Sequence, residues 1–317
     1  MRLAAVAAAI AVVAALLSIT SATAEPDEPT VVNRTWIDTR TVDLEIASPA
    51  LGHNAMVRLL MPVRWVDQPT REWPVLYLLH GCCDPLDYQS WTHFTDVEQL
   101  TANEDVIVVL PSDGRIGMYS NWWNNGGSNK PDWETFHTEE VRSIIERDYR
   151  AGTKRAAAGL SIGGYGAMAY AYRKRGMFAA AASYSGSPDT LAPLQPAGIK
   201  GILESEGLDP NALWGDEVAN NDIWRAHNPA NHVADLRGVQ LYVSAGDGNP
   251  GPLDPPGQEF EAHESMALAS SSIFVRQLDL AGVPVTTNFY GAGTHNWTYW
   301  ERELHASWPM IKRALGL

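Results

Sequence analysis

A serine framed by two glycines is the strongest chemical signal in this chain. Residues 159–163 read Gly-Leu-Ser-Ile-Gly, a G-x-S-x-G motif centred on Ser161. An alanine-rich run that predicts a strand over residues 155–160 precedes the motif, and a run that predicts a helix over residues 163–175 overlaps its end. A strand, a tight turn and a helix in this order form a nucleophile elbow, which raises the serine hydroxyl above the sheet. A glycine-rich packing turn is the alternative, and the flanking strand and helix favour the elbow.

A serine hydroxyl attacks a carbonyl group only when a base takes its proton, so a histidine is required. Of the nine histidines, His295 is placed best, between a strand predicted over residues 283–290 and a helix predicted from about Tyr299. His305 lies inside that amphipathic helix and is more typical of a surface residue. The histidines before Ser161 contradict the order serine, acid, histidine that is expected for an elbow.

The acid that orients the histidine must lie between Ser161 and His295, and two carboxylates qualify. Asp247 directly follows a strand predicted over residues 239–243, which is the commonest place for such a group. Glu264 lies on the helix that follows. The position of the strand end, taken alone, favours Asp247.

A serine that attacks a carbonyl group in this way also needs two backbone N–H groups that bind the oxyanion. Ile162, the residue after the nucleophile, supplies one. The second is expected from the loop after a buried strand predicted over residues 73–79, where His80-Gly81-Cys82-Cys83 exposes the Cys82 amide. Cys82 and Cys83 are the chain's two cysteines, and a reactive thiol pair or a strained vicinal disulfide is the alternative interpretation.

Charge and composition exclude several classes of protein. The chain has 317 residues, and 23 Lys and Arg against 37 Asp and Glu give a net charge of −14 at pH 7. Such a chain lacks the basic surface that neutralises the phosphates of nucleic acids, so we expect no nucleic-acid partner. Asp216, Glu217 and Asp254 could bind calcium, but acidic residues more commonly form a solvated surface. We expect no metal and no cofactor.

The first residues have the layout of a secretory signal peptide, predicted over residues 1–24. Arg2 precedes an apolar run to about Ile19, and Ala22-Thr23-Ala24 supplies a cleavage site. An uncleaved membrane anchor is the alternative, and the polar residues after the cleavage site disfavour it. We therefore expect a protein in the extracellular space or cell envelope, without stable membrane insertion after cleavage.

Short β-branched runs alternate with helical stretches, which predicts a mostly parallel sheet in one domain over residues 25–317. A leading antiparallel hairpin is expected within residues 42–61, and a helix over residues 138–149. Residues 188–232 carry few sheet signals and are predicted to be an insertion near the sheet edge. The remaining strands are predicted at residues 105–110 and 178–184.

Longer segments carry a resemblance to a known family. They are LLHG at 78–81, QSW at 89–91, YSNWW at 119–123, WETFH at 133–137, GLSIGGYGAM at 159–168 and GTHNWTYW at 293–300. In this order they resemble the esterase D group of α/β-hydrolases, above all exported actinobacterial-type esterases and antigen 85-type mycolyltransferases. The resemblance implies an α/β-hydrolase fold, with a mostly parallel central sheet and helices on both faces.

The resemblance also implies roles for single residues. In the mycolyltransferases the acid is a glutamate on the helix after the late strand, and a Ser/Thr-rich stretch follows it. That pattern falls on Glu264, followed by ALASSSIFV, so the resemblance implies Glu264 in place of Asp247. It further implies that Ser161 and His295 complete a triad and that the Cys82 and Ile162 amides form the oxyanion hole. Trp297 would line the acyl or alcohol site.

One departure separates this chain from the mycolyltransferases. They carry an aspartate before the glycine of the oxyanion loop and an arginine soon after it, where this chain has His80 and Cys82-Cys83-Asp84. We expect an exported serine carboxylic ester hydrolase that forms an acyl-enzyme on a small-molecule or lipid ester. The alternative is a mycolyltransferase-like acyltransferase that uses a sugar or glycerol hydroxyl, and a non-catalytic relative is the least favoured interpretation.

Overall fold

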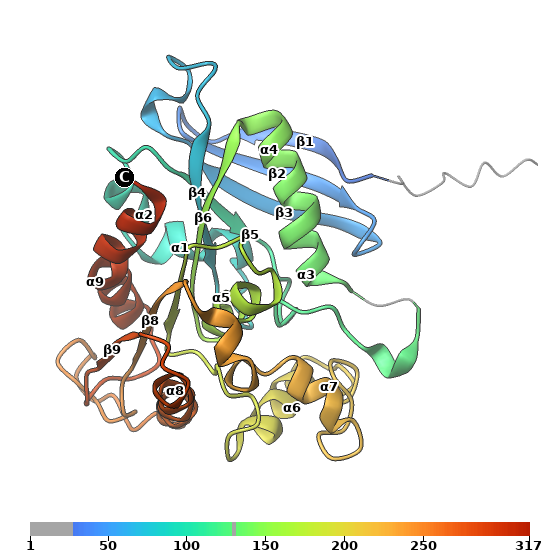
Figure 1. The fold of residues 1–317 in the computed structure, drawn as a ribbon, viewed down its shortest axis with the longest axis vertical. Coiled ribbons are helices and arrows are strands. Elements are labelled where there is room, and N and C mark those ends of the chain that lie inside the picture. Colours follow the sequence, from blue (N-terminus) through green and yellow to red (C-terminus); the bar gives the residue numbers. More distant parts are fainter. Residues whose placement is uncertain (1–27, 129–130) are drawn as a thin grey trace, which may run out of the picture.

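The computed structural model describes residues 28–128 and 131–317, so the predicted signal peptide lies outside the described residues. One sheet with the strand order β1-β2-β3-β5-β4-β6-β7-β8-β9 runs through the molecule (Figure 1). Its strands are β1 (Thr30–Trp36), β2 (Thr41–Ser48), β3 (His53–Leu60), β4 (Trp73–Leu79), β5 (Ile107–Pro111), β6 (Ala151–Leu160), β7 (Ala180–Tyr184), β8 (Gln240–Ala245) and β9 (Thr286–Phe289).

The sheet is antiparallel at its start and parallel from β5 to β9. The predicted hairpin is present as β2 and β3, and β3 pairs antiparallel with β5. The unpredicted strand β1 pairs antiparallel with β2 at the sheet edge; it is mostly exposed and lacks an apolar alternation. The strands β5, β4, β6, β7, β8 and β9 are parallel neighbours, so their carboxyl ends meet at one end of the sheet.

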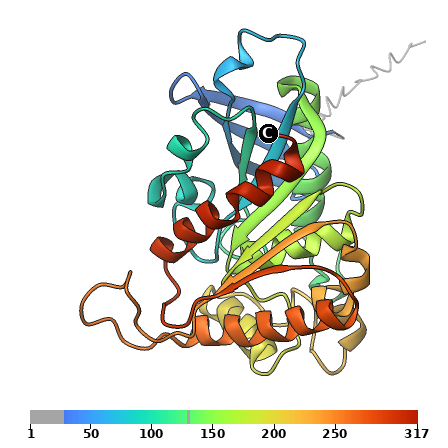
Figure 2. The same ribbon diagram turned by 60° about the vertical axis from the view of Figure 1, so that its left-hand side comes forward.

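Helices cover both faces of the sheet, which confirms the α/β-hydrolase fold. Alternate side chains of β4 point into two cores on opposite faces of the sheet. Tyr77 belongs to the core that also contains residues of α4 (Arg142–Tyr149), α5 (Ile162–Arg173) and α8 (Ala262–Leu280), whereas Leu76 belongs to the core that contains the helices of the other face. Those helices are α1 (Ser90–Phe94), α2 (Val97–Leu100) and α9 (Trp297–Leu315). Figure 2 shows the red α9 and the light green α4 and α5 on opposite sides of the sheet.

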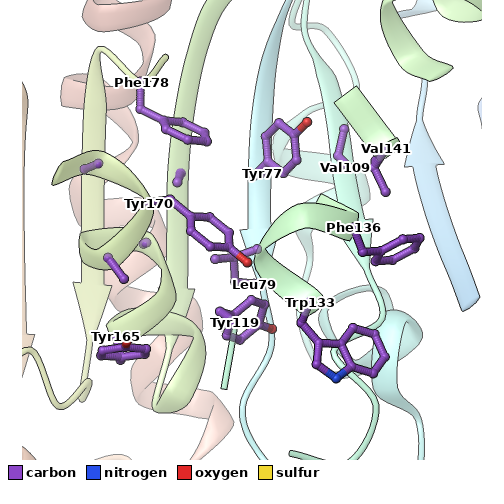
Figure 3. Packing of buried hydrophobic residues seen from close by; sticks show 14 of the residues in the cluster. Tyr77, Leu79, Val109, Tyr119, Trp133, Phe136, Val141, Tyr165, Tyr170 and Phe178 are labelled. Carbon is purple, nitrogen blue, oxygen red and sulfur yellow. The ribbon is translucent and has the colours of Figure 1, made fainter. Parts of the chain in front are cut away.

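Aromatic rings fill the core between the sheet and α5. Tyr77 meets Phe178 edge to face, with ring centroids 5.7 Å apart, and Tyr170 stacks on Phe178 at 6.4 Å (Figure 3). This packing fixes α5, and therefore the turn that precedes it, against β4 and β6.

Two segments differ from their predictions. The helix predicted over residues 138–149 begins earlier, with α3 (Trp133–Thr135) and a π-helical turn (Phe136–Val141) that leads into α4. The segment 188–232 contains α6 (Gln195–Ser205) and α7 (Asn221–Ala226) but lies beyond the carboxyl ends of the parallel strands, not at the sheet edge (Figure 1). Its apolar residues cover the end of the sheet that carries Ser161, which a pattern of hydrophobicity does not reveal. None of the helices in the described ranges is long and apolar enough to cross a membrane.

Candidate active site

Ser161 stands at the turn between β6 and α5 in a strained backbone conformation. Its φ of 53° and ψ of −123° lie in a region that costs a non-glycine residue of the order of 1–3 kcal/mol. A Cβ atom at Gly159 would clash with the carbonyl group of Gly163, and one at Gly163 would clash with the carbonyl group of Leu79. The two glycines of the motif are therefore required by this turn, which has the geometry of a nucleophile elbow.

His295 and Glu264 form a hydrogen-bonded pair beside the elbow. His295 Nδ1 lies 2.7 Å from Glu264 Oε2, and the Glu264 side chain is fully buried while that of His295 is 19% exposed. An ionised carboxylate can only accept hydrogen bonds, so neutral His295 carries its proton on Nδ1. Nε2 of His295 is then the basic atom.

Three further donors hold the other oxygen of Glu264. Its Oε1 accepts from Ser185 Oγ at 2.8 Å, from the Tyr290 hydroxyl at 3.0 Å and from the Gly246 amide at 2.5 Å. The Glu264 amide itself donates to Glu261 Oε2 at 2.8 Å in the N-cap of α8. Backbone and side chain are both anchored, so the carboxylate has one orientation toward His295. Sequence reasoning did not identify these supporting residues, because they directly follow β7, β8 and β9 and are distant from one another in the chain.

Asp247, the acid favoured by its position after β8, is held in a different way. Its Oδ1 accepts from the Asn249 amide at 2.9 Å, and its own amide donates to the carbonyl group of Gly291 at 2.7 Å. A carboxylate bonded to the backbone two residues on is typical of an Asx turn. The structure therefore joins His295 to Glu264 and places Asp247 in a turn.

Asp254 supports the loop that carries His295. Its carboxylate accepts from the hydroxyl of Thr294, from Asn296 Nδ2 at 2.7 Å and from the Tyr299 hydroxyl at 3.0 Å. Thr294 and Asn296 flank His295 in the chain, so one carboxylate ties both sides of the candidate base. The sequence offered no signal for this role, because Asp254 lies forty residues before the loop that it holds.

The other acidic candidates for a calcium site are paired with a cation. Lys200 lies 3.3 Å from Asp216 and contacts Glu217 as well. Within residues 28–128 and 131–317, no group of three or more His, Cys, Asp or Glu side chains is arranged to hold a metal ion.

Ser161 and His295 open into a common cavity of about 320 Å³. This volume is at the small end of the range for ligand sites, about 300–1,000 Å³. Helices α6 and α8 form one part of its apolar wall, and Gln195 joins them by donating from Nε2 to the Met266 carbonyl group at 3.0 Å. The apolar lining comes from Met118, Ile162, Tyr165, Ile199, Ile202, Met266 and Ala267.

The loop after β4 lies against the elbow, as the sequence predicts for an oxyanion loop. A Cβ atom added to Gly81 would lie 3.3 Å from the Cβ atom of Ser161. Cys82 and Ile162 both line the cavity, and the Ile162 amide belongs to the first turn of α5, whose N–H groups have no acceptor within the helix. The Cys83 amide donates to the Arg115 carbonyl group at 2.7 Å, so this next amide is already used.

Trp297 lies in an aromatic cluster and not in the lining of this cavity. Its ring stacks on Phe94 at 4.9 Å and meets Trp91 edge to face at 5.2 Å. The ring that contacts His295 is Trp300, with centroids 4.8 Å apart. Trp297 as a substrate contact therefore stays a prediction that the cavity lining does not support.

A family model described as a putative esterase matches residues 48–311. The chain belongs to this esterase family. The solved structure of Mycobacterium tuberculosis MPT51 (FbpC1) is similar to it, with a TM-score of 0.71 and 26% identity over 84% of this chain and 96% of that chain.

Curated relatives of this esterase-family chain carry names of two activities. "Esterase Rv1288" of Mycobacterium tuberculosis is 31% identical over 262 residues, which are 80% of this chain and 55% of the relative. The chain thus spans about half the length of that relative. The diacylglycerol acyltransferase/mycolyltransferase Ag85B of Mycolicibacterium smegmatis is 30% identical over 76% of this chain and 77% of the relative. The names of the relatives therefore support an enzyme that hydrolyses esters or transfers acyl groups.

Proposed function

We propose that this protein is an exported serine carboxylic ester hydrolase that works through an acyl-enzyme, with Ser161, His295 and Glu264 as its triad. The observation that carries the proposal is the 2.7 Å hydrogen bond from His295 Nδ1 to the buried Glu264 carboxylate, in the wall of a cavity shared with Ser161. Export rests on the predicted signal peptide and implies a mature chain that begins at Glu25.

The reaction would use each group in a defined step. Ser161 Oγ attacks the ester carbonyl carbon while its proton passes to Nε2 of His295, and the Cys82 and Ile162 amides donate to the oxyanion. When the intermediate collapses, the C–O bond breaks and His295 returns the proton to the leaving alcohol. Water then attacks the acyl-Ser161 ester in the same way, and the acid leaves. Glu264 stays ionised throughout and stabilises the imidazolium form of His295.

The loop around His80 favours water over a bound alcohol as the acyl acceptor. His80 is 1% exposed, and its Nε2 lies 2.8 Å from Asp87 Oδ1. It does not line the cavity that contains Ser161 and therefore offers no group to an acceptor sugar. Acyl transfer is the second candidate, and the similarity to relatives named mycolyltransferases favours it.

The cavity lining supports an ester with a compact apolar acyl group. Its walls are mostly apolar, and Ser161 is half-buried at one side. A small-molecule ester fits this volume, and a long lipid ester would have to extend beyond it.

A chromogenic short-chain ester tests this proposal. The mature protein is expected to release acid at a rate that glycerol or trehalose does not change, and Ser161→Ala is expected to have no activity above background. Acylated glycerol or trehalose as the main product would favour the acyltransferase. Absence of turnover over a panel of acyl lengths would favour the non-catalytic relative.

A further inference from the structure

Two neighbouring thiols share the cavity with the candidate nucleophile. Cys82 and Cys83 both line the cavity that contains Ser161, and both are partly exposed and free. Their Sγ atoms lie 2.6 Å apart, and Cys83 is in the left-handed region with φ 66°. They are the chain's two cysteines, so any thiol chemistry of this protein occurs here.

The surroundings give the two thiols different reactivity. The hydrogen bond between the two Sγ atoms lowers the pKa of the Cys83 thiol, and the Arg115 guanidinium acts in the same direction against burial and the Glu206 carboxylate. The same hydrogen bond, together with burial, raises the pKa of the Cys82 thiol. Thiolates are the reactive form of cysteine, and a low-pKa, accessible cysteine beside a second one is typical of a redox-sensitive pair.

We propose that Cys83 and Cys82 form a thiol modification site in the wall of the Ser161 cavity, at which Cys83 reacts with small-molecule disulfides and Cys82 resolves the adduct. We further propose that modification lowers ester turnover, and this second part rests on the proposed function. The ligand class is a disulfide of a small thiol, which serves as the oxidant.

The chemistry proceeds in two balanced exchanges. The Cys83 thiolate attacks the disulfide, so that a Cys83–sulfur bond forms, the disulfide bond breaks and one thiolate leaves. Cys82 then loses its proton to solvent and attacks Cys83 Sγ, which expels the second thiolate and leaves a Cys82–Cys83 bond. The two cysteines lose two electrons, and the small disulfide gains them as two thiols.

Closure of this bond would disturb the oxyanion loop. Adjacent Cα atoms lie about 3.8 Å apart across a trans peptide, shorter than the roughly 4.4–6.8 Å usual for a disulfide. The peptide between the cysteines must therefore adjust, and it contains the Cys83 amide that donates to Arg115 at 2.7 Å. Movement there shifts Cys82, whose own amide is the proposed oxyanion donor. A strained disulfide is also easily reduced, so the change is reversible.

Titration of the native mature protein with the aromatic disulfide 5,5′-dithiobis(2-nitrobenzoate) tests the site, because each exchange releases one coloured thiolate. The wild type is expected to release two per chain and to end with no adduct, its intact mass lower by two hydrogen atoms. Cys82→Ser is expected to release one and keep a thionitrobenzoate adduct. Cys83→Ser is expected to react at least tenfold more slowly. Each protein is also titrated in urea, which shows that its thiols can react when exposed.

Ester turnover, measured after removal of the reagent, tests the coupling. The treated wild type is expected to lose at least nine-tenths of its activity and to regain it with dithiothreitol, whereas treated Cys83→Ser keeps its own starting activity. A native protein that reacts only in urea, or a wild type that keeps the adduct, would overturn the modification site. Full oxidation with unchanged turnover would overturn the coupling. The thiol counts are repeated on Ser161→Ala, so they decide the site chemistry even if ester hydrolysis itself fails.

Discussion

Replacement of Glu264 by glutamine should cripple the enzyme while preserving its shape. Glutamine matches the side chain in size, but one oxygen becomes an NH₂ group. Three donors, from Ser185, Tyr290 and Gly246, point at the position of Oε1, so the amide oxygen must stay there. The NH₂ group therefore faces His295 Nδ1, where the wild type has an acceptor at 2.7 Å.

This arrangement forces the wrong tautomer on the base. His295 Nδ1 must accept a hydrogen bond from the new amide, so its proton moves to Nε2, which can then no longer take the proton of Ser161. In a serine protease triad, the equivalent change lowers kcat about 10⁴-fold, or about 5.4 kcal/mol in the barrier. We expect a loss of this size in Glu264→Gln, with KM changed little.

Steady-state ester hydrolysis by Glu264→Gln and by Asp247→Asn measures this difference, with circular dichroism as the check on folding. Asp247→Asn is the matched control, since the hydrogen bond from the Asn249 amide does not involve His295. We expect this variant to keep activity within about threefold of the wild type, as for a substitution in a partly exposed turn. The opposite ranking of the two variants would refute the assignment of the acid. Equal losses in both would refute the role given to the four hydrogen bonds at Glu264.

Three further predictions follow from other parts of the structure. Asp254→Asn should lower kcat about tenfold, which is about 1.4 kcal/mol in the barrier, because the loop of His295 loses a charged acceptor. Steady-state kinetics should show KM nearly unchanged, and a change in KM alone would contradict this role. Burial lowers the pKa of His137 to about 3, below the value of about 6.5 in an unfolded chain. The contribution of neutral His137 to stability is therefore full above pH 6.5 and is lost as the pH falls toward 3, by up to about 1.4 kcal/mol per pH unit. Urea unfolding should therefore show that the free energy of unfolding changes less between pH 7 and pH 5 in His137→Gln than in the wild type, by up to about 2 kcal/mol. An equal change in the two proteins would contradict the low pKa of His137. Gly163→Ala should lower the free energy of unfolding by about 1–3 kcal/mol or more through the clash with β4, and an unchanged Tm would show that the turn relaxes.

The local parts of the site could be predicted from the sequence. Ser161 and its elbow follow from a short motif, since two glycines, a strand and a helix are all contiguous in the chain. His295 follows from its place between a strand and a helix. The parallel strands could be predicted for the same reason, because short buried apolar runs are recognised from neighbouring residues.

The parts that depend on tertiary packing could not be derived from strand position. The end of β8 points to Asp247, yet the chain runs on through a long loop, and the first turn of α8 brings Glu264 back to His295. The resemblance to a known family implied Glu264; the spacing did not. The support from Asp254 and the cavity wall from α6 carried no local signal, because their partners are distant in sequence.

The central claim is that Ser161 is the nucleophile, and covalent labelling tests it most directly. A fluorophosphonate that mimics the tetrahedral intermediate should add once per chain of the mature protein. Peptide mapping should place the label on Ser161, Ser161→Ala should take up none, and Glu264→Gln should react far more slowly than the wild type. Labelling at another residue, or equal labelling of wild type and Ser161→Ala, would contradict the account.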